Sequence, residues 1–174
     1  MDVENELEEL INKVVRRREQ VWNFLEYLKS NTDFFTAPAS SKYHSAFRGG
    51  LLYHSILVTK IMLDLNKALK ANLDEESIVV TGLFHDVGKI NTYIQFGSKY
   101  GKVDNGMPHE VLSLVHTSKF LDLTEDEMHA ILYHNGLYTP LGKELVGKER
   151  PLTLLLHFAD LWCSRFEEGR DGRG

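Results

Sequence analysis

Residues 84–90, FHDVGKI, end an apolar run with a histidine and an aspartate side by side, His85 and Asp86. An imidazole and a carboxylate are common ligands of metal ions, although the same pair is also ordinary at a protein surface. His54 interrupts a second apolar run, LLYHSILV, and Asp160 interrupts a third, TLLLHFADLW. The hydrophobic pattern therefore places these four side chains on the core faces of three separate helices.

Such groups need partners, because a buried carboxylate or imidazole without one costs several kcal/mol. A metal cation can satisfy two histidines and two aspartates together and leave room for a bound water. A single histidine on an apolar helix is more often a hydrogen-bonded core residue, and we assign His116, His129 and His157 to that class. The ordered set across three helices favours a metal site for the other four residues.

The first half of the chain predicts three helices that lead up to these residues. Apolar residues recur at three- and four-residue steps over residues 3–30, which predicts one long amphipathic helix. A loop over residues 31–50 follows, because it holds Pro38 and the Gly49-Gly50 pair. We then expect helices over about 51–70 and 73–87, the latter starting at a capping box formed by Asn72 and Glu75.

The second half predicts three more helices. Gly88 ends the third helix, and the glycine-rich residues 91–106 form a long loop or a small hairpin. The start signals are proline at a first helical position or a capping box, and Gly136 ends the second of these helices. Pro108 starts a helix to about Leu121, the capping box of Thr124 and Glu127 starts the next helix, and Pro151 starts a helix to about Glu168. In the last helix Thr153, His157, Asp160 and Ser164 form one polar stripe.

The sequence as a whole predicts an all-α single domain of about six helices over residues 1–174. Residues 1–35 form the N-terminal helix and the loop after it, residues 36–168 the metal-binding core, and residues 169–174 a flexible tail. The acidic start, MDVENELEEL, lacks the pattern of a signal peptide, and no apolar run approaches the length of a membrane span. Cys163 is the only cysteine, which excludes an intrachain disulfide. We expect a cytoplasmic protein.

The ordered residues His54, His85-Asp86 and Asp160 resemble the H…HD…D signature of the HD superfamily of metal-dependent phosphohydrolases. The resemblance spans roughly residues 36–165. FHDVGK matches the HDxGK form of the family, and KYHSAFRGGLLYHS is close to the stretch before the first metal histidine of bacterial HD-domain 3′–5′ exoribonucleases. The resemblance implies an all-α fold that holds its metals among the helices.

The resemblance also implies a two-metal ligand set. His54, His85, Asp86 and Asp160 would hold one ion, and Asp86 would bridge to a second ion held by His109 and His134. His134 has an alternative role, since a histidine at a helix C-terminus can cap it. A mixed histidine and carboxylate set favours Mn, Fe, Co, Ni or Zn over Mg.

Two such cations generate a hydroxide near neutral pH and clamp the oxygens of a phosphoryl group. Lys89 is the candidate for stabilising the charge that develops on that group, as the family also implies. Its alternative role is to satisfy the dipole of the helix that ends there. In the loop before His54, three residues are candidates for contacting the phosphate or the leaving group: His44, which the exoribonuclease stretch matches, Lys42 and Arg48.

The leading hypothesis is a phosphohydrolase that acts on small nucleotides, such as a 5′-nucleotidase on deoxynucleoside monophosphates. The same centre could serve a phosphodiesterase, on cyclic dinucleotides for example, or a short 3′–5′ exonuclease. A non-catalytic, metal-stabilised ligand-binding module is a third hypothesis, which Lys89 and the complete ligand set disfavour. The net charge of −5 argues against long nucleic acids, and no segment corresponds to the nucleic-acid-binding domain of the exoribonucleases. The oligomeric state stays open.

Overall fold

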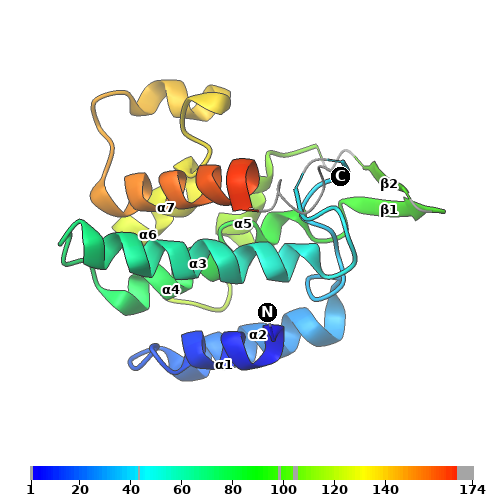
Figure 1. Ribbon diagram of the computed structural model, residues 1–174, viewed down its shortest axis with the longest axis horizontal. Helices are drawn as coiled ribbons and strands as arrows, with labels where there is room; N and C mark the ends of the chain where they lie inside the picture. The colour runs from blue at the N-terminus through cyan, green and yellow to red at the C-terminus, as the bar shows by residue number, and fades with distance from the viewer. Residues whose placement is uncertain (1, 43, 98, 104–105, 168–174) are drawn as a thin grey trace.

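The centre of the molecule is helix α4 (Glu75–Phe84), in which every residue from Ile78 to Phe84 is buried. The computed structural model describes residues 2–42, 44–97, 99–103 and 106–167 (Figure 1). Asp74 caps α4 by accepting a hydrogen bond from the backbone N–H of Ser77. The predicted capping box at Asn72 is therefore wrong, and Asn72 instead has a positive φ of 55°. This central position explains why the sequence SIVVTGLF is apolar on nearly all sides of the helix.

Helix α3 (Gly50–Ala68) packs along α4 and contributes to both apolar clusters of the core (Figure 1). One cluster joins the first half of α3 to α4 and to the N-terminal helices. The other joins the second half of α3 to α7 (Pro151–Trp162). Among the described residues, no helix has the length and apolar character needed to span a membrane.

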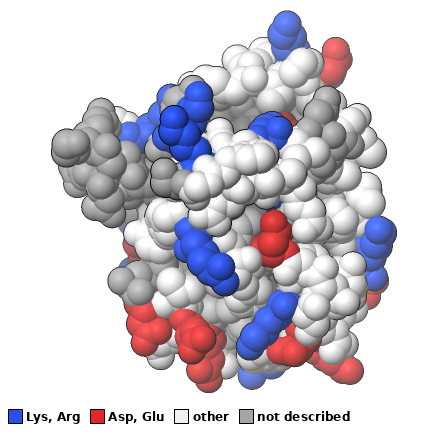
Figure 2. Space-filling view, turned by 90° about the vertical axis from the view of Figure 1, so that its right-hand side faces the viewer, with Lys and Arg blue, Asp and Glu red and all other residues white. Residues whose placement is uncertain are grey.

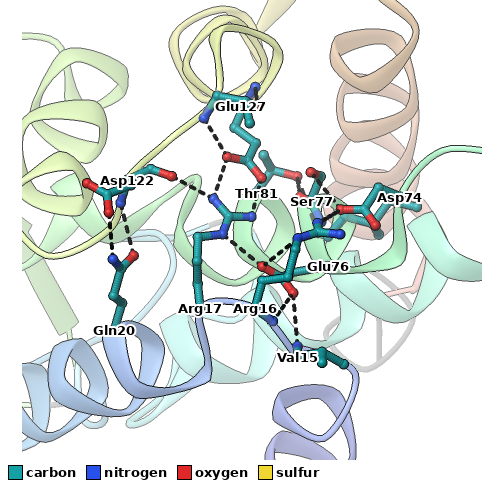
Figure 3. A network of polar contacts seen from close by, with 12 residues as sticks. Val15, Arg16, Arg17, Gln20, Asp74, Glu76, Ser77, Thr81, Asp122 and Glu127 are labelled. Carbon is teal, nitrogen blue, oxygen red and sulfur yellow. Dashed lines mark hydrogen bonds and ion pairs between the residues drawn. The ribbon is translucent and has the colours of Figure 1, made fainter.

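The single helix predicted over residues 3–30 is wrong. Two helices, α1 (Val3–Ile11) and α2 (Arg18–Asn31), are separated by a turn. The carboxylate of Glu76 on α4 accepts hydrogen bonds from the backbone N–H groups of Val15 and Arg16 in this turn, at 2.9 and 2.8 Å (Figure 3). The break depends on an acceptor about sixty residues away in sequence, so the local apolar period could not reveal it.

Arg17 in the same turn ties the N-terminal helices to the rest of the bundle (Figure 3). Its guanidinium donates to Glu76 on α4 at 2.8 Å and to both carboxylate oxygens of Glu127 at 2.7 and 2.6 Å. Glu127 lies in the first turn of α6 (Glu125–Tyr133) and also completes the predicted capping box with Thr124, which is confirmed. We call Arg17, Glu76 and Glu127 the arginine clamp.

A short turn and a two-stranded hairpin follow α4 in the chain. After the 3₁₀ turn η1 (Val87–Lys89), strands β1 (Tyr93–Phe96) and β2 (Lys99–Lys102) form an antiparallel hairpin, which confirms the hairpin alternative. The described part of the chain has seven α-helices, one more than predicted because of the break before Arg18. The all-α class is confirmed. The other elements are α5 (His109–Ser118), with Pro108 as its cap, the 3₁₀ turns η2 (Gly136–Tyr138) and η3 (Pro140–Leu145), and the π-helical turn η4 (Cys163–Glu167). The predicted end at Glu168 and the tail 169–174 lie outside the described residues.

Two glycines allow the close helix contacts that position the polar residues. A Cβ on Gly82 of α4 would lie 2.4 Å from Oγ1 of Thr59 on α3. A Cβ on Gly88 would lie 2.1 Å from the carbonyl oxygen of His109, and the Gly88 N–H donates to Ser113 Oγ at 2.8 Å. Because both positions lack a side chain, α3 and α5 approach the HD dipeptide from two sides.

Candidate metal centre

Five elements bring the six predicted metal ligands together. Their histidine nitrogens and carboxylate oxygens form three overlapping groups, within each of which the ligand atoms lie within 4.8 Å of one another. The groups are His54–His85–Asp86, His85–His134–Asp160 and Asp86–His109–His134. Side chains that are up to 106 residues apart in sequence therefore meet at one point, and no predicted ligand is left outside.

Two of these histidines lie at the C-terminal ends of helices and are oriented in the same way. His85 caps α4, and its Nδ1 lies 2.9 Å from the carbonyl oxygen of Gly82. His134 caps α6, and its Nδ1 lies 2.8 Å from the carbonyl oxygen of Ile131. An Nδ1–H that donates to a carbonyl leaves Nε2 with its lone pair, which is the form that binds a metal. The capping role predicted as an alternative for His134 is thus compatible with ligation.

Asp86 lies between two pairs of histidines. Its Oδ1 is 3.2 Å from Nε2 of His109 and 3.5 Å from Nε2 of His134. Its Oδ2 is 3.5 Å from Nε2 of His54 and 3.6 Å from Nε2 of His85. Each carboxylate oxygen therefore faces a different pair, which is the arrangement that a bridging carboxylate requires.

The charges of the centre suit a cation. Burial lowers the pKa of His85 to about 3, so its imidazole is neutral at physiological pH. Burial alone would raise the pKa of Asp86, but the ammonium of Lys89 lowers it well below its usual value. Burial would also raise the pKa of Asp160, but a hydrogen bond with His54 lowers it, and its Oδ1 lies 3.2 Å from Nε2 of that histidine. Ionised carboxylates and neutral imidazoles are the forms that bind a metal.

One buried atom tests whether the residues fit a metal. Nε2 of His85 is fully buried and has no hydrogen-bond partner among the described residues. A buried polar atom without a partner is rare and costly in a folded protein. A cation at this point would satisfy the lone pair, so the donor set fits a transition metal.

Lys89 contacts the centre directly. Its Nζ lies 2.6 Å from Oδ2 of Asp86, and its side chain is only 14% exposed. Burial opposes the charge of this lysine, but Asp86 raises its pKa to about 12. Lys89 is therefore a fixed cation beside the carboxylate, and it also lines the adjoining pocket. The predicted role of Lys89 in stabilising charge on a phosphoryl group stays a prediction.

A pocket of about 470 Å³ opens onto the centre. His44 lines it, and the ring of His44 lies 5.2 Å from that of His54. Lys42 and Arg48 are exposed and are not among the lining residues, so their contact with substrate stays a prediction. At the end of the molecule that carries β1 and β2, basic side chains are spread from the top to the lower part of the surface. Most acidic ones lie along the lower edge, with others near the centre and at the top (Figure 2).

Several polar residues of the pocket were not predicted. The predicted polar stripe contains His157 and Ser164, and Nδ1 of His157 donates a hydrogen bond of 2.7 Å to the carbonyl oxygen of His134. The other unpredicted residues come shortly after a proposed metal-ligand residue in the sequence, and no local pattern marks them. They are Glu110 beside the centre, and Asn135, Tyr138 and Arg165 in the pocket lining. His129 instead contacts Thr153 Oγ1 at 2.6 Å, outside the three ligand groups, as a core histidine would.

Comparison with known proteins finds the HD domain family over residues 51–165. A dihydroneopterin 2′,3′-cyclic phosphate phosphodiesterase of Methanocaldococcus jannaschii is 27% identical over 132 residues, which are 71% of this chain and 50% of that protein. The 3′-5′ exoribonuclease YhaM of Bacillus subtilis is 26% identical over 141 residues, 76% of this chain and 44% of that protein. The chain spans about half the length of these curated relatives. No solved structure matches the chain.

Proposed function

Because the chain belongs to the HD domain family, we propose that it is a metal-dependent phosphohydrolase that acts on a small nucleotide. The observation that carries the proposal is the position of Asp86, whose two oxygens face two separate pairs of histidines. An arginine or lysine partner alone would not need a pair of imidazoles on each side of one carboxylate. A pocket beside this carboxylate gives a substrate access to it.

We assign the six residues to two ligand sets. His54, His85, Asp86 and Asp160 would hold one ion, and Asp86, His109 and His134 a second. Bound transition metals would supply a hydroxide near neutral pH and positive charge for the phosphoryl oxygens. The metal type remains within the group Mn, Fe, Co, Ni or Zn that a mixed histidine and carboxylate set favours.

The other residues of the pocket bind and orient the substrate. Lys89 keeps its positive charge beside Asp86 and is positioned to stabilise the charge that develops on a transferred phosphoryl group. His44, Asn135 and Arg165 line the same pocket and can donate hydrogen bonds to the phosphate, the sugar or the leaving group. The single cysteine, Cys163, is buried and can form no disulfide within the chain, in keeping with the reducing cytoplasm.

A second candidate activity is the hydrolysis of a phosphodiester. The names of both relatives describe cleavage of such a bond, in a cyclic phosphate and in RNA. The same centre would serve a monoester and a diester, since both reactions place a hydroxide in line with a leaving oxygen. Substrate choice then depends on the pocket beyond the metals.

The test is a metal analysis followed by a matched substrate panel. The purified protein should hold about two transition-metal ions per chain and should release product from at least one nucleotide. The panel compares deoxynucleoside 5′-monophosphates, 2′,3′-cyclic nucleotides, a cyclic dinucleotide and a short oligonucleotide, with products separated by chromatography. The control is Asp86→Ala protein purified in the same way. A helical wild-type protein that takes up no metal from supplemented buffer and cleaves nothing would refute the proposal.

A further inference from the structure

Glu110 is a buried acidic residue beside the centre that none of the proposed ligand sets uses. It is the second residue of α5 and is 1% exposed. A buried carboxylate is retained only where its oxygens have partners. Its partners therefore indicate what this side chain does.

The two oxygens of Glu110 bind two different elements. Oε2 lies 3.2 Å from Nδ1 of His109, the first residue of α5. Oε1 accepts a hydrogen bond of 3.0 Å from the side-chain amide of Asn135, which directly follows His134 at the end of α6. Glu110 thus links the two segments that carry His109 and His134, the two histidines of the second ligand set.

The position of His109 in its helix explains why a carboxylate is needed. His85 and His134 end their helices, so each finds a helical carbonyl three residues earlier for its Nδ1. His109 begins its helix and has no preceding helical turn to supply such a carbonyl. Oε2 of Glu110, 3.2 Å from Nδ1 of His109, lies where it can take that role, and Nε2 of His109 faces Oδ1 of Asp86 at 3.2 Å.

Resting on the proposed function, we propose that Glu110 is the positioning residue of the second metal ion. It holds His109 in the tautomer that binds metal and ties it, through Asn135, to His134. A carboxylate behind a ligating imidazole also makes that imidazole a stronger donor than a carbonyl does. Loss of such a partner typically weakens metal binding by about 10- to 100-fold.

The experiment measures metal binding directly, by titration of metal-free protein with Mn²⁺ or Co²⁺ in a calorimeter and by metal content after dialysis. Glu110→Gln keeps the shape of the side chain but removes its charge. We expect this variant to bind the first ion as the wild type does and the second ion about 10- to 100-fold more weakly. Glu110→Asp, which keeps the carboxylate on a shorter stem, should recover part of that affinity.

The matched control is Glu127→Gln. Glu127 is also a fully buried glutamate in the first turn of a helix, but it belongs to the arginine clamp. We expect this control to lower the melting temperature and to keep the affinities of both ions. A Glu110→Gln protein with wild-type affinity for both ions would overturn the inference, as would an equal loss of both ions in step with a lower melting temperature. A wild-type protein that binds no metal at all would instead refute the proposed function.

Discussion

The arginine clamp and the metal centre are both buried clusters of charge, but they are completed in different ways. In the clamp every carboxylate oxygen has a donor: Glu76 accepts from Val15, Arg16 and Arg17, and Glu127 accepts from Arg17 and Thr124 (Figure 3). In the centre, Nε2 of His85 has no hydrogen-bond partner among the described residues, and a pocket adjoins the cluster. Burial of charge is common to both, so it does not by itself mark a functional site.

The difference between the two clusters shows what does mark a functional site. A closed network of hydrogen bonds offsets the cost of burying its charges and joins elements, as Arg17 joins α2 to α4 and α6. A cluster with donor atoms left over and an opening to solvent can still bind a ligand. Variants in the clamp should therefore affect stability, and variants in the centre should affect metal binding and rate.

The largest effect is expected from Asp86→Ala. Asp86 is the one residue shared by both proposed ligand sets, so its loss should remove the bridge between the ions. We expect hydrolysis to fall on the order of a thousand-fold or more, together with a loss of bound metal. Steady-state kinetics and elemental analysis of one sample measure both. Near wild-type activity in this variant would show that Asp86 does not bridge.

The second effect should appear in stability instead. Arg17→Ala removes the guanidinium that binds both Glu76 and Glu127 and leaves Glu127 buried without its cation, which should lower the free energy of unfolding by roughly 3–5 kcal/mol. Urea denaturation followed by circular dichroism measures the change, and metal content per folded chain should stay that of the wild type. Arg17→Lys is the matched control, because it keeps the charge but loses the fork that binds both carboxylates. A stable Arg17→Ala protein would show that the clamp is dispensable.

Lys89→Ala separates the two kinds of cluster most finely, because Lys89 is an ion-pair partner within the centre. If Lys89 donates to the transition state, the substitution should lower kcat about a hundred-fold, equivalent to roughly 3 kcal/mol, with a much smaller change in KM. Metal content should stay unchanged, and it is measured on the same sample because Nζ contacts Asp86. A change in kcat of only about two- or three-fold would assign Lys89 to helix capping, since a surface cation at a helix end contributes little.

The smallest effect is the response of the clamp to acid. Burial alone would raise the pKa values of Glu76 and Glu127, but hydrogen bonds from Arg17 outweigh this effect and hold both pKa values below the ordinary value. Groups with a lowered pKa in the folded state stabilise it fully above their ordinary pKa and lose that contribution as the pH falls further. The free energy of unfolding should therefore decrease between pH 5 and pH 3 more steeply in the wild type than in Arg17→Ala. Parallel curves for the two proteins would contradict this account.

The local signals in the sequence determined most of the helices and indicated four of the ligand residues, and the family resemblance added His109 and His134. The Thr124–Glu127 capping box starts α6 as predicted, because both of its hydrogen bonds form within one turn. The apolar run of α4 places His85 and Asp86 in the core, because a helix that is apolar on all sides must be buried. These features depend on neighbours within a few residues, and a linear pattern records such neighbours.

Only the tertiary structure decided which of these groups would meet. The break between α1 and α2 needs Glu76 of a distant helix, and the role of Glu110 needs Asn135, twenty-five residues away. The close approach of α5 to the HD dipeptide depends on the space left at Gly88. Each of these contacts joins residues that are far apart in the sequence and follow no regular spacing. A periodic pattern in the sequence therefore cannot predict them. The chain therefore specifies its helices locally, but their packing determines whether a buried charge is closed into a clamp or left open to a metal and a substrate.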